Sequence, residues 1–189
     1  MTSIIRTHFK EHATVVTALE HIEADIAAAG KLCAEALIAG HRVYLCGNGG
    51  SASDAQHIAA ELIGRFVGER RALPAVALNT DTSALTAIAN DYGYDCVFER
   101  QVEGLCQAGD VLIGISTSGQ SQNVNRAITA AQALGCKTVG LSGKTGGALR
   151  AMVHVAVVVP SDVTARIQEC HILIGHILCD LIERELGLI

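Results

Sequence analysis

Two pairs of polar side chains lie in stretches that otherwise have the apolar pattern of helices. His57 precedes Glu61 by four residues, and Gln168 precedes His176 by eight. Burying an imidazole or a carboxylate without a partner costs several kcal/mol, so we expect these side chains to find partners in the fold. If the fold brings the two pairs together, they form either a proton-transfer site or a His/Glu/Gln/His metal site.

The spacing within each pair restricts how its members can act together. Residues four apart on a helix face the same side, so His57 and Glu61 form one half of a site. Eight residues of helix span about 12 Å, and the directions of the first and last differ by about 80°. Gln168 and His176 therefore reach one ion only if it lies between them, and otherwise they serve the sites of different subunits. The sequence leaves both arrangements open.

The composition excludes several classes of protein. The chain has 189 residues, is 50% hydrophobic and 17% charged, and contains only two prolines, which suits one domain with a buried core. A net charge of −5 without blocks of like charge, together with the absence of tryptophan, argues against a nucleic-acid groove or an anionic membrane surface. The longest apolar runs are too short to span a bilayer.

The cysteines and the N-terminus indicate in which cellular compartment the protein is expected. The seven cysteines are scattered and form no CxxC motif, a pattern typical of reduced structural thiols. The first residues are charged early and lack the apolar core of a signal peptide. These features predict a cytoplasmic protein.

Short apolar segments rich in β-branched residues alternate with helical ones. We expect strands at Arg42–Cys46, Ala75–Leu78, Asp110–Ile115, Lys137–Leu141 and Val153–Val159. Helices are expected at 51–64, 82–108 (in two pieces), 121–135 and 162–186, and over 1–39 with a possible break at Gly30 and a stop at Gly40. Continuous apolar strands separated by helices imply a parallel sheet covered on both faces.

The predicted fold is therefore α/β, with a three-layer, doubly wound, flavodoxin-like sheet of five parallel strands. One domain spans 1–189, with N-terminal helices over 1–39 and the α/β core over 40–189. The last helix, 162–186, is apolar nearly all round, so we expect it to be buried on more than its sheet-facing side and to pack against another subunit. His171 or His154 is expected to be a hydrogen-bonded core histidine.

Two loops follow predicted strands at the end of the sheet where such folds bind ligands. The first is Gly47–Asp54 (GNGGSASD), in which Ser51 and Asp54 have the spacing of a capping box that starts a helix. The second is Ser116–Ser121 (STSGQS), which also leads into a helix. Glycines let backbone N–H groups approach an anion, and four hydroxyls within six residues suit a phosphate monoester.

Both loops also have simpler interpretations. Each could be an ordinary turn between a strand and a helix, where Gly, Ser and Thr are common. The first also fits G-x-G-x-x-A, a weak dinucleotide fingerprint, with Asp81 as a late candidate for the ribose-binding acid. The hydroxyl-rich loop has no role in that scheme. It favours a cradle for a single phosphate instead.

At this point a resemblance to a known family becomes specific. Ile115–Gly119 followed by Ser121 resembles the phosphate loop of sugar isomerase (SIS) domains. The resemblance extends along essentially the whole chain to the phosphoheptose isomerase (sedoheptulose 7-phosphate isomerase) branch of that family. The segments that carry it are Cys46–Ser51, Ala55–His57, Glu61, Thr86–Gly93, Gly109–Gly114, Gly146–Gly147 and Arg166–His171.

The resemblance implies a reaction and a site. It implies an aldose–ketose isomerase that converts sedoheptulose 7-phosphate to D-glycero-D-manno-heptose 7-phosphate through an enediolate, for ADP-heptose and lipopolysaccharide precursor synthesis. Glu61 and His176 match the acid–base pair. The positions that match the substrate-binding ones are Asn48, Gly49, Gly50, Ser51, Glu61, Asn90, Asp91, Ser116, Thr117, Ser118, Ser121 and Gln168.

The resemblance also implies a metal and an assembly. His57, Glu61, Gln168 and His176 match positions that bind one zinc ion per active site. Family members are homotetramers with active sites at subunit interfaces. A glutamine amide is an uncommon zinc ligand, so we expect a site that loses its metal easily.

Two rival functions share parts of this pattern. A non-catalytic SIS relative, the DnaA initiator-associating protein that regulates replication initiation, shares Asn79–Asp81 and Ala165–Glu169 but lacks the groups matching Glu61 and His176. A regulatory sugar-phosphate sensor would need the phosphate loop but neither acid–base group. This chain has both groups, which favours the enzyme, although Ala165 replaces an aspartate that many isomerases have.

Overall fold

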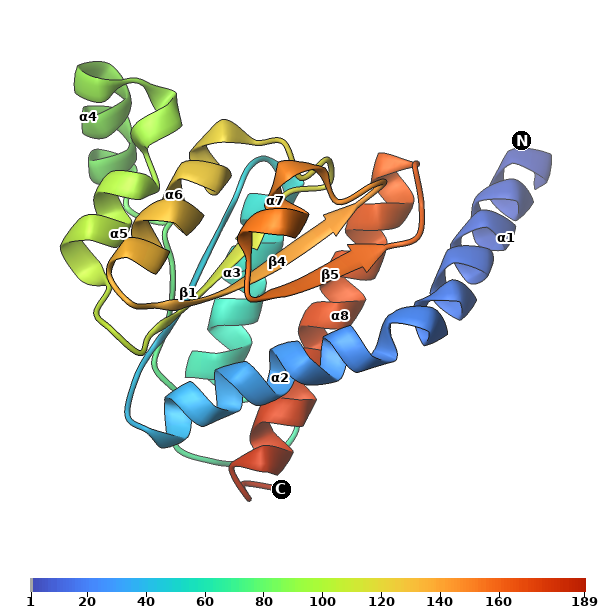
Figure 1. The fold of residues 1–189 in the computed structure, drawn as a ribbon. Helices are drawn as coiled ribbons and strands as arrows, with labels where there is room; N and C mark the ends of the chain where they lie inside the picture. The colour runs from blue at the N-terminus through green and yellow to red at the C-terminus, as the bar shows by residue number, and fades with distance from the viewer. Residues whose placement is uncertain (1) are drawn as a thin grey trace.

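The computed structural model describes residues 2–189 and has one sheet with helices on both faces (Figure 1). The five strands are β1 (Val43–Gly47), β2 (Ala75–Ala77), β3 (Val111–Ile115), β4 (Lys137–Gly143) and β5 (Val155–Val159). The helices are α1 (Thr2–Ala18), α2 (Glu23–Ile38), α3 (Gly50–Ile63), α4 (Thr82–Tyr92), α5 (Glu99–Leu105), α6 (Gln122–Ala133), α7 (Gly147–Met152) and α8 (Thr164–Glu185). Two short 3-10 helices are η1 (Leu19–Ile22) and η2 (Tyr94–Cys96).

All neighbouring strands are parallel, in the order β2-β1-β3-β4-β5. The chain leaves β1 for β2 on one side and later returns to β3 on the other, so the order reverses between β1 and β3. Gly47 at the end of β1 is paired with Ile115 at the end of β3. The predicted doubly wound sheet is confirmed, and the loops after β1 and β3 start side by side at its reversal point.

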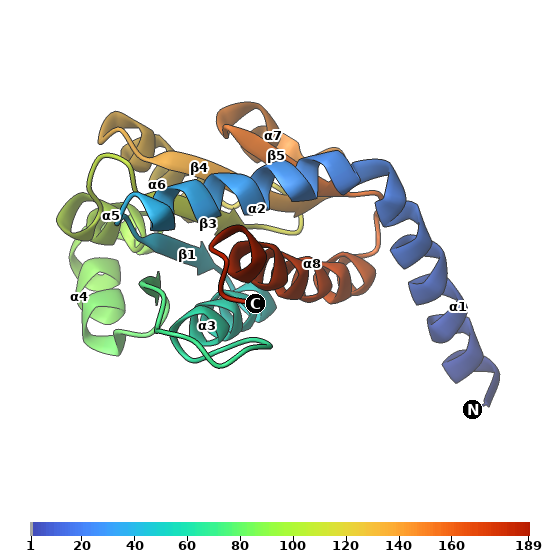
Figure 2. The same cartoon turned by 90° about the horizontal axis from the view of Figure 1, so that it is seen from below.

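The strands contribute side chains to two hydrophobic cores, one on each face of the sheet, because successive side chains point to opposite faces. Val43 and Leu45 join the core beneath α2, α3 and α8, whereas Tyr44 and Cys46 join the core beneath α5, α6 and α7. Figure 2 shows α2, α3 and α8 together on one side of the sheet. The predicted continuous apolar strands match this double burial, since every residue of β1 and β3 is buried.

The N-terminal helices differ from the prediction in where they break. The break falls at η1, which directly follows Ala18, and Gly30 lies inside α2. A Cβ on Gly30 would lie 2.9 Å from Leu181 Cδ1, so this glycine allows α2 and α8 to approach closely instead of ending a helix. Helix α1 extends away from the sheet (Figure 1), and none of its described residues is buried.

The start of α3 also corrects a prediction. The N-cap is Gly49, with φ 56°, and no side chain caps the helix. Ser51 therefore lies inside α3, and the predicted capping box with Asp54 is wrong because the helix begins before it. Helix α7 was not predicted; it is only six residues long, which is too short to give a clear periodic pattern.

Two histidines and the seven cysteines outside the candidate site have structural surroundings. His171 is buried and donates a hydrogen bond from Nε2 to the Ser142 carbonyl (3.0 Å), whereas His154 is exposed and bonds Thr138 through Nδ1. All seven cysteines are free thiols, and all except Cys96 are buried. Among residues 2–189, no helix is long and apolar enough to cross a membrane.

Burial of His171 predicts a pH-dependent stability. Burial lowers the pKa of its imidazole to about 4, against an ordinary value near 6.5 in the unfolded chain. As the pH falls from 6.5 to 4, the unfolded state therefore takes up the proton first, and the stability contributed by the neutral ring is lost. The His171→Gln variant keeps a donor for Ser142 but does not titrate.

We expect the free energy of unfolding of the unmodified chain to fall by roughly 3 kcal/mol more than that of His171→Gln between pH 7 and pH 4. Urea unfolding at both pH values measures the difference, with exposed His21→Gln as the control. An identical pH dependence for the unmodified chain and His171→Gln would show that the buried ring is not responsible.

Candidate active site

Helices α3 and α8 run parallel, side by side, and carry the polar pairs that the sequence singles out. Gly50 of α3 lies against Gln168 of α8, and Ile58 lies against Gly175. A Cβ on Gly175 would be 2.6 Å from Ile58 Cδ1, so only glycine allows this separation of the helices. Close packing at this level brings the neighbouring residues, His57 and His176, within reach of each other.

Three of the four predicted polar residues converge within one chain. His57 Nε2 lies 3.0 Å from His176 Nε2 and 3.3 Å from Glu61 Oε1. One ligand atom from each of these residues lies within 4.8 Å of those of the other two. A second subunit is therefore not needed to bring His176 to His57.

The chemistry of this cluster fits a divalent metal ion. Two imidazole nitrogens and a carboxylate oxygen are the ligands of many catalytic zinc sites, which keep a fourth position open. Ligand atoms about 2.1 Å from a tetrahedral ion are about 3.4 Å apart, close to the separations between His57 and its two neighbours. The His57 side chain is 49% exposed and that of Glu61 is 25% exposed, so a small molecule can approach.

Gln168 lies elsewhere along the same two helices. Its Nε2 lies only 1.4 Å from where a Cβ on Gly50 would be, so the amide packs on the first turn of α3. Gly50 precedes His57 by seven residues, or about 10 Å along the helix. In the chain Gln168 thus faces the glycine loop, and its place among the metal ligands stays a prediction.

Hydrogen bonds hold the glycine loop after β1 in place. The side-chain amides of Asn48 and Asn123 bond each other reciprocally, at 2.8 and 2.9 Å. The Asn48 Oδ1 also accepts a bond from the Tyr94 hydroxyl (3.1 Å). Ser51 is buried and donates its N–H to the Asn48 carbonyl (3.0 Å). Asn48 therefore connects the loop to α6 and η2, two contacts that sequence spacing could not reveal.

The hydroxyl-rich loop after β3 packs tightly against the loop before α7. A Cβ on Gly119, where φ is 65°, would lie 1.9 Å from the Gly146 carbonyl oxygen. Ser116 and Ser121 are 2.9 Å apart through their Oγ atoms, and Ser118 Oγ accepts the Gln120 N–H (3.2 Å). The loop leads directly into α6, a helix of 12 residues, whose N-terminus favours an anion.

Ser116 is buried, whereas Thr117, Ser118 and Ser121 are partly exposed. Three of the four predicted phosphate-binding side chains are therefore accessible to a ligand. The packing also accounts for the glycine pair before α7, since a side chain at Gly147 would lie 2.5 Å from the Ser118 carbonyl oxygen.

Asn90 and Asp91 lie at the exposed C-terminal end of α4. The Asn90 amide donates to Asp91 (2.8 Å), and within the described chain no hydrogen bond joins either residue to the two loops. Helix α4 sits at the periphery (Figure 1) and has no buried residue among those described. The substrate-binding role of both residues stays a prediction.

Asp54 is a buried carboxyl near the cluster. The sequence pattern suggested only a helix-capping role for it. It lies on α3 three residues before His57, and in the part of the chain that is described its Oδ2 has no hydrogen-bond partner. Burial raises the pKa of Asp54 to about 6, although the charge of His57 acts against this rise. The carboxyl therefore ionises less readily than an exposed aspartate.

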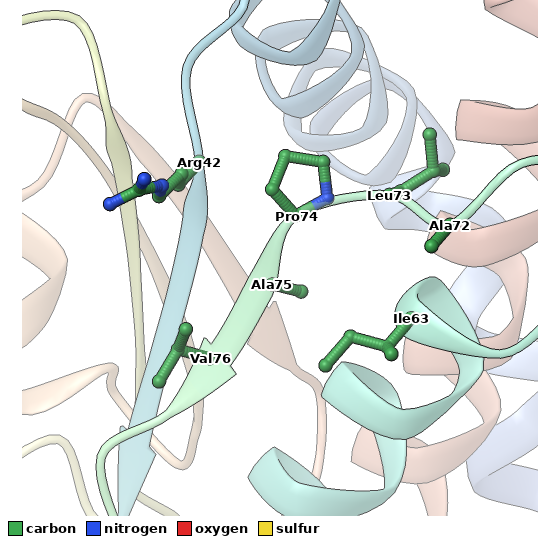
Figure 3. A pocket seen from close by; sticks show the side chains of 7 residues that line it. All are labelled: Arg42, Ile63, Ala72, Leu73, Pro74, Ala75 and Val76. Carbon is green, nitrogen blue, oxygen red and sulfur yellow. The ribbon is translucent and has the colours of Figure 1, made fainter.

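An apolar pocket at the opposite end of the sheet does not belong to this site. Figure 3 shows its lining, which consists of Arg42, Ile63, Ala72, Leu73, Pro74, Ala75 and Val76. Arg42 and Pro74 directly precede β1 and β2, so the pocket lies at the amino ends of these strands. The loops that carry the candidate site leave from the carboxyl ends.

Comparisons with known proteins agree with this arrangement. The family model for the SIS domain matches residues 7–143. The phosphoheptose isomerase of a Nitratiruptor species is 63% identical over 164 residues, which are 87% of this chain and 88% of that relative.

Two solved structures are also similar over nearly the whole chain. The phosphoheptose isomerase from Neisseria gonorrhoeae superposes with a TM-score of 0.91 at 45% identity, covering 97% of this chain and 98% of that one. The phosphoheptose isomerase from Francisella tularensis superposes with a TM-score of 0.93 at 39% identity, covering 97% and 100%. The chain belongs to the SIS domain family and, within it, to the phosphoheptose isomerases.

Proposed function

We propose that this chain is an aldose–ketose isomerase that converts sedoheptulose 7-phosphate to D-glycero-D-manno-heptose 7-phosphate. The observation that carries the proposal is the convergence of His57, Glu61 and His176 on neighbouring helices of one chain. The similarity to proteins named phosphoheptose isomerase over nearly the full length supports the same reaction.

The reaction moves a proton between C1 and C2 of the sugar through an enediolate. One group must remove a carbon-bound proton, and a second must protonate oxygen or carbon. We assign these roles to Glu61 and His176, because a carboxylate and an imidazole can both act near neutral pH and together contribute about 10²–10⁴-fold. Glu61 and His176 both lie within reach of His57, which leaves room for the substrate on the exposed side.

The remaining predicted residues would hold the substrate. Ser116, Thr117, Ser118 and Ser121 would bind the phosphate with the N–H groups at the start of α6. The loop Asn48–Ser51, with Gln168 packed on it, would bind the sugar hydroxyls. Asn90 and Asp91 would complete the site.

We also propose one zinc ion per site, held by His57, Glu61 and His176. Gln168 packs on Gly50 of its own chain, so we propose that it serves as a further ligand only at the site of another subunit. When bound, zinc would polarise the sugar oxygens and stabilise the enediolate. The donor types and the open side of the cluster support this assignment.

We propose a homotetramer with active sites at its interfaces, because apolar side chains are exposed on the surface of the chain. Ile4, Ile5 and Phe9 of α1 are among the exposed large hydrophobic residues, and their burial against another copy would be favourable. We further propose a cytoplasmic enzyme whose product enters ADP-heptose synthesis. The initiator-associating alternative is not favoured, because the relatives reported above are isomerases.

The acid–base assignment predicts the effect of Glu61→Gln. Because the amide cannot accept a proton, we expect turnover to fall by at least about 10²-fold. NMR of a mixture with sedoheptulose 7-phosphate and zinc measures the aldose product. The matched control is Glu35→Gln, which removes an exposed carboxylate on α2 and is expected to match the unmodified chain.

Two results would count against these assignments. If the unmodified chain, supplied with zinc, forms no aldose, the isomerase proposal is wrong. If Glu61→Gln turns over as fast as Glu35→Gln, the proton is transferred by another group.

The zinc proposal predicts a reversible loss of activity. Dialysis against a chelator should lower turnover by about tenfold or more, and added zinc should restore it. His57→Ala should need a higher zinc concentration for the same recovery, whereas His21→Ala, an exposed histidine in η1, should not. Full activity of the chelated, metal-free protein would contradict a role for zinc.

A further inference from the structure

A buried ion pair holds the connection between α3 and β2, residues 64–74. Arg70 Nε donates to Glu183 Oε1 at 2.7 Å, and the two side chains are 1% and 0% exposed. The other N–H groups of Arg70 donate to backbone carbonyls of Glu61, Leu62, Gly64 and Arg71. Arg70 thus ties the last turn of α3 to the end of α8.

Glu183 completes this arrangement from the other side. Its oxygens accept the backbone N–H groups of Phe66 (3.0 Å), Val67 (3.2 Å) and Gly68 (3.5 Å). Burial opposes ionisation of this carboxyl, but the bonds from the Phe66 N–H and from Arg70 outweigh it and hold the pKa of Glu183 below its usual range. A buried ion pair adds little stability over apolar side chains of the same size. We therefore consider what the Arg70–Glu183 pair positions.

The ion pair fixes the backbone at Phe66, whose ring covers one of the proposed acid–base groups. The rings of Phe66 and His176 are stacked, with centroids 5.3 Å apart and planes 25° from parallel. The His57 ring lies 5.2 Å from His176 at a tilt of 59°. The His176 imidazole therefore lies close to two rings, and the Phe66 ring stacks on it.

The same ion pair also reaches the second acid–base residue. Arg70 Nη2 donates to the Glu61 carbonyl at 2.8 Å. One buried pair at the end of α8 thus restrains the backbone of Glu61 and the ring that covers His176. Groups that act on a reacting atom must be held close to their productive geometry, which requires support of this kind.

We propose that Phe66 is a positioning residue for His176, and that the Arg70–Glu183 pair holds Phe66 in place. The inference rests on the proposed function for its effect on turnover, but the placement of the imidazole is a separate property. Residues that orient a metal ligand commonly change metal affinity by about 10–100-fold when they are replaced. Zinc binding by the chain therefore reports on the placement without any turnover.

The test replaces Phe66 in two ways. Phe66→Leu keeps an apolar side chain but removes the flat face, and Phe66→Tyr keeps that face. We expect Phe66→Leu to weaken zinc binding by about tenfold, measured by competition with a chelating dye, and to lower kcat with little change in KM. It should also broaden the imidazole NMR resonances of His176 in the metal-free protein. Phe66→Tyr should restore all three properties.

The matched control separates positioning from packing. Leu32 of α2 is another partly buried residue packed against the same hydrophobic core. It lies far in sequence from the candidate metal ligands. Leu32→Ala should lower the Tm while leaving zinc affinity and the His176 resonances unchanged. If Phe66→Leu behaves like Leu32→Ala, Phe66 is only a packing residue and the proposal is overturned.

The readouts also separate this proposal from the enzyme assignment. If the unmodified chain forms no aldose but Phe66→Leu still weakens zinc binding and frees the imidazole, only the proposed function fails. If the unmodified chain binds no zinc, unchanged His176 resonances in Phe66→Leu overturn the positioning role, and broadened resonances support it.

Discussion

The close parallel packing of α3 on α8 is the constraint on which the candidate site depends. At Gly175 the helices are so close that a single added carbon would lie 2.6 Å from Ile58. This contact sets the separation of the Nε2 atoms of His57 and His176, which are 3.0 Å apart. A larger residue at 175 would force the helices apart and separate the ligands, although neither ligand would itself be changed. The proposed activity therefore depends on Gly175, although this residue has no side chain that could take part in the reaction.

The sheet provides the second element of the arrangement. Because Gly47 and Ile115 are paired at the reversal point of the strand order, the glycine loop and the hydroxyl-rich loop begin next to each other. The first loop continues directly into α3, which carries two of the three residues of the cluster. The glycine loop and the proposed phosphate loop thus leave from the same edge of the sheet, where such folds bind ligands.

The sequence predicted much of this architecture because its signals are local. Continuous apolar strands and the two candidate ligand-binding loops follow from the pattern of side chains along the chain. The pairing of His57 with Glu61 follows from helix geometry. The capping box failed because Gly49, with its positive φ, starts the helix earlier than Ser51. Local pattern cannot choose between two such starting points.

Contacts between distant segments could not be predicted. The spacing of Gln168 and His176 left open whether His176 joins His57 in one chain, because that depends on how two helices pack. Nothing in the sequence near Phe66 indicates its hydrogen bond with Glu183, 117 residues later. The same holds for Asn123, which bonds Asn48 across 75 residues.

We propose that proton transfer through an enediolate takes place at this cluster of one carboxylate and two imidazoles. The most direct measurement is the reaction of sedoheptulose 7-phosphate in deuterated water, followed by NMR at the carbons that interconvert. An enediolate intermediate at a cluster whose His57 is half exposed should exchange with solvent, so we expect deuterium in the aldose product. Aldose that forms without any solvent deuterium would contradict it and would indicate transfer of a hydride between the two carbons.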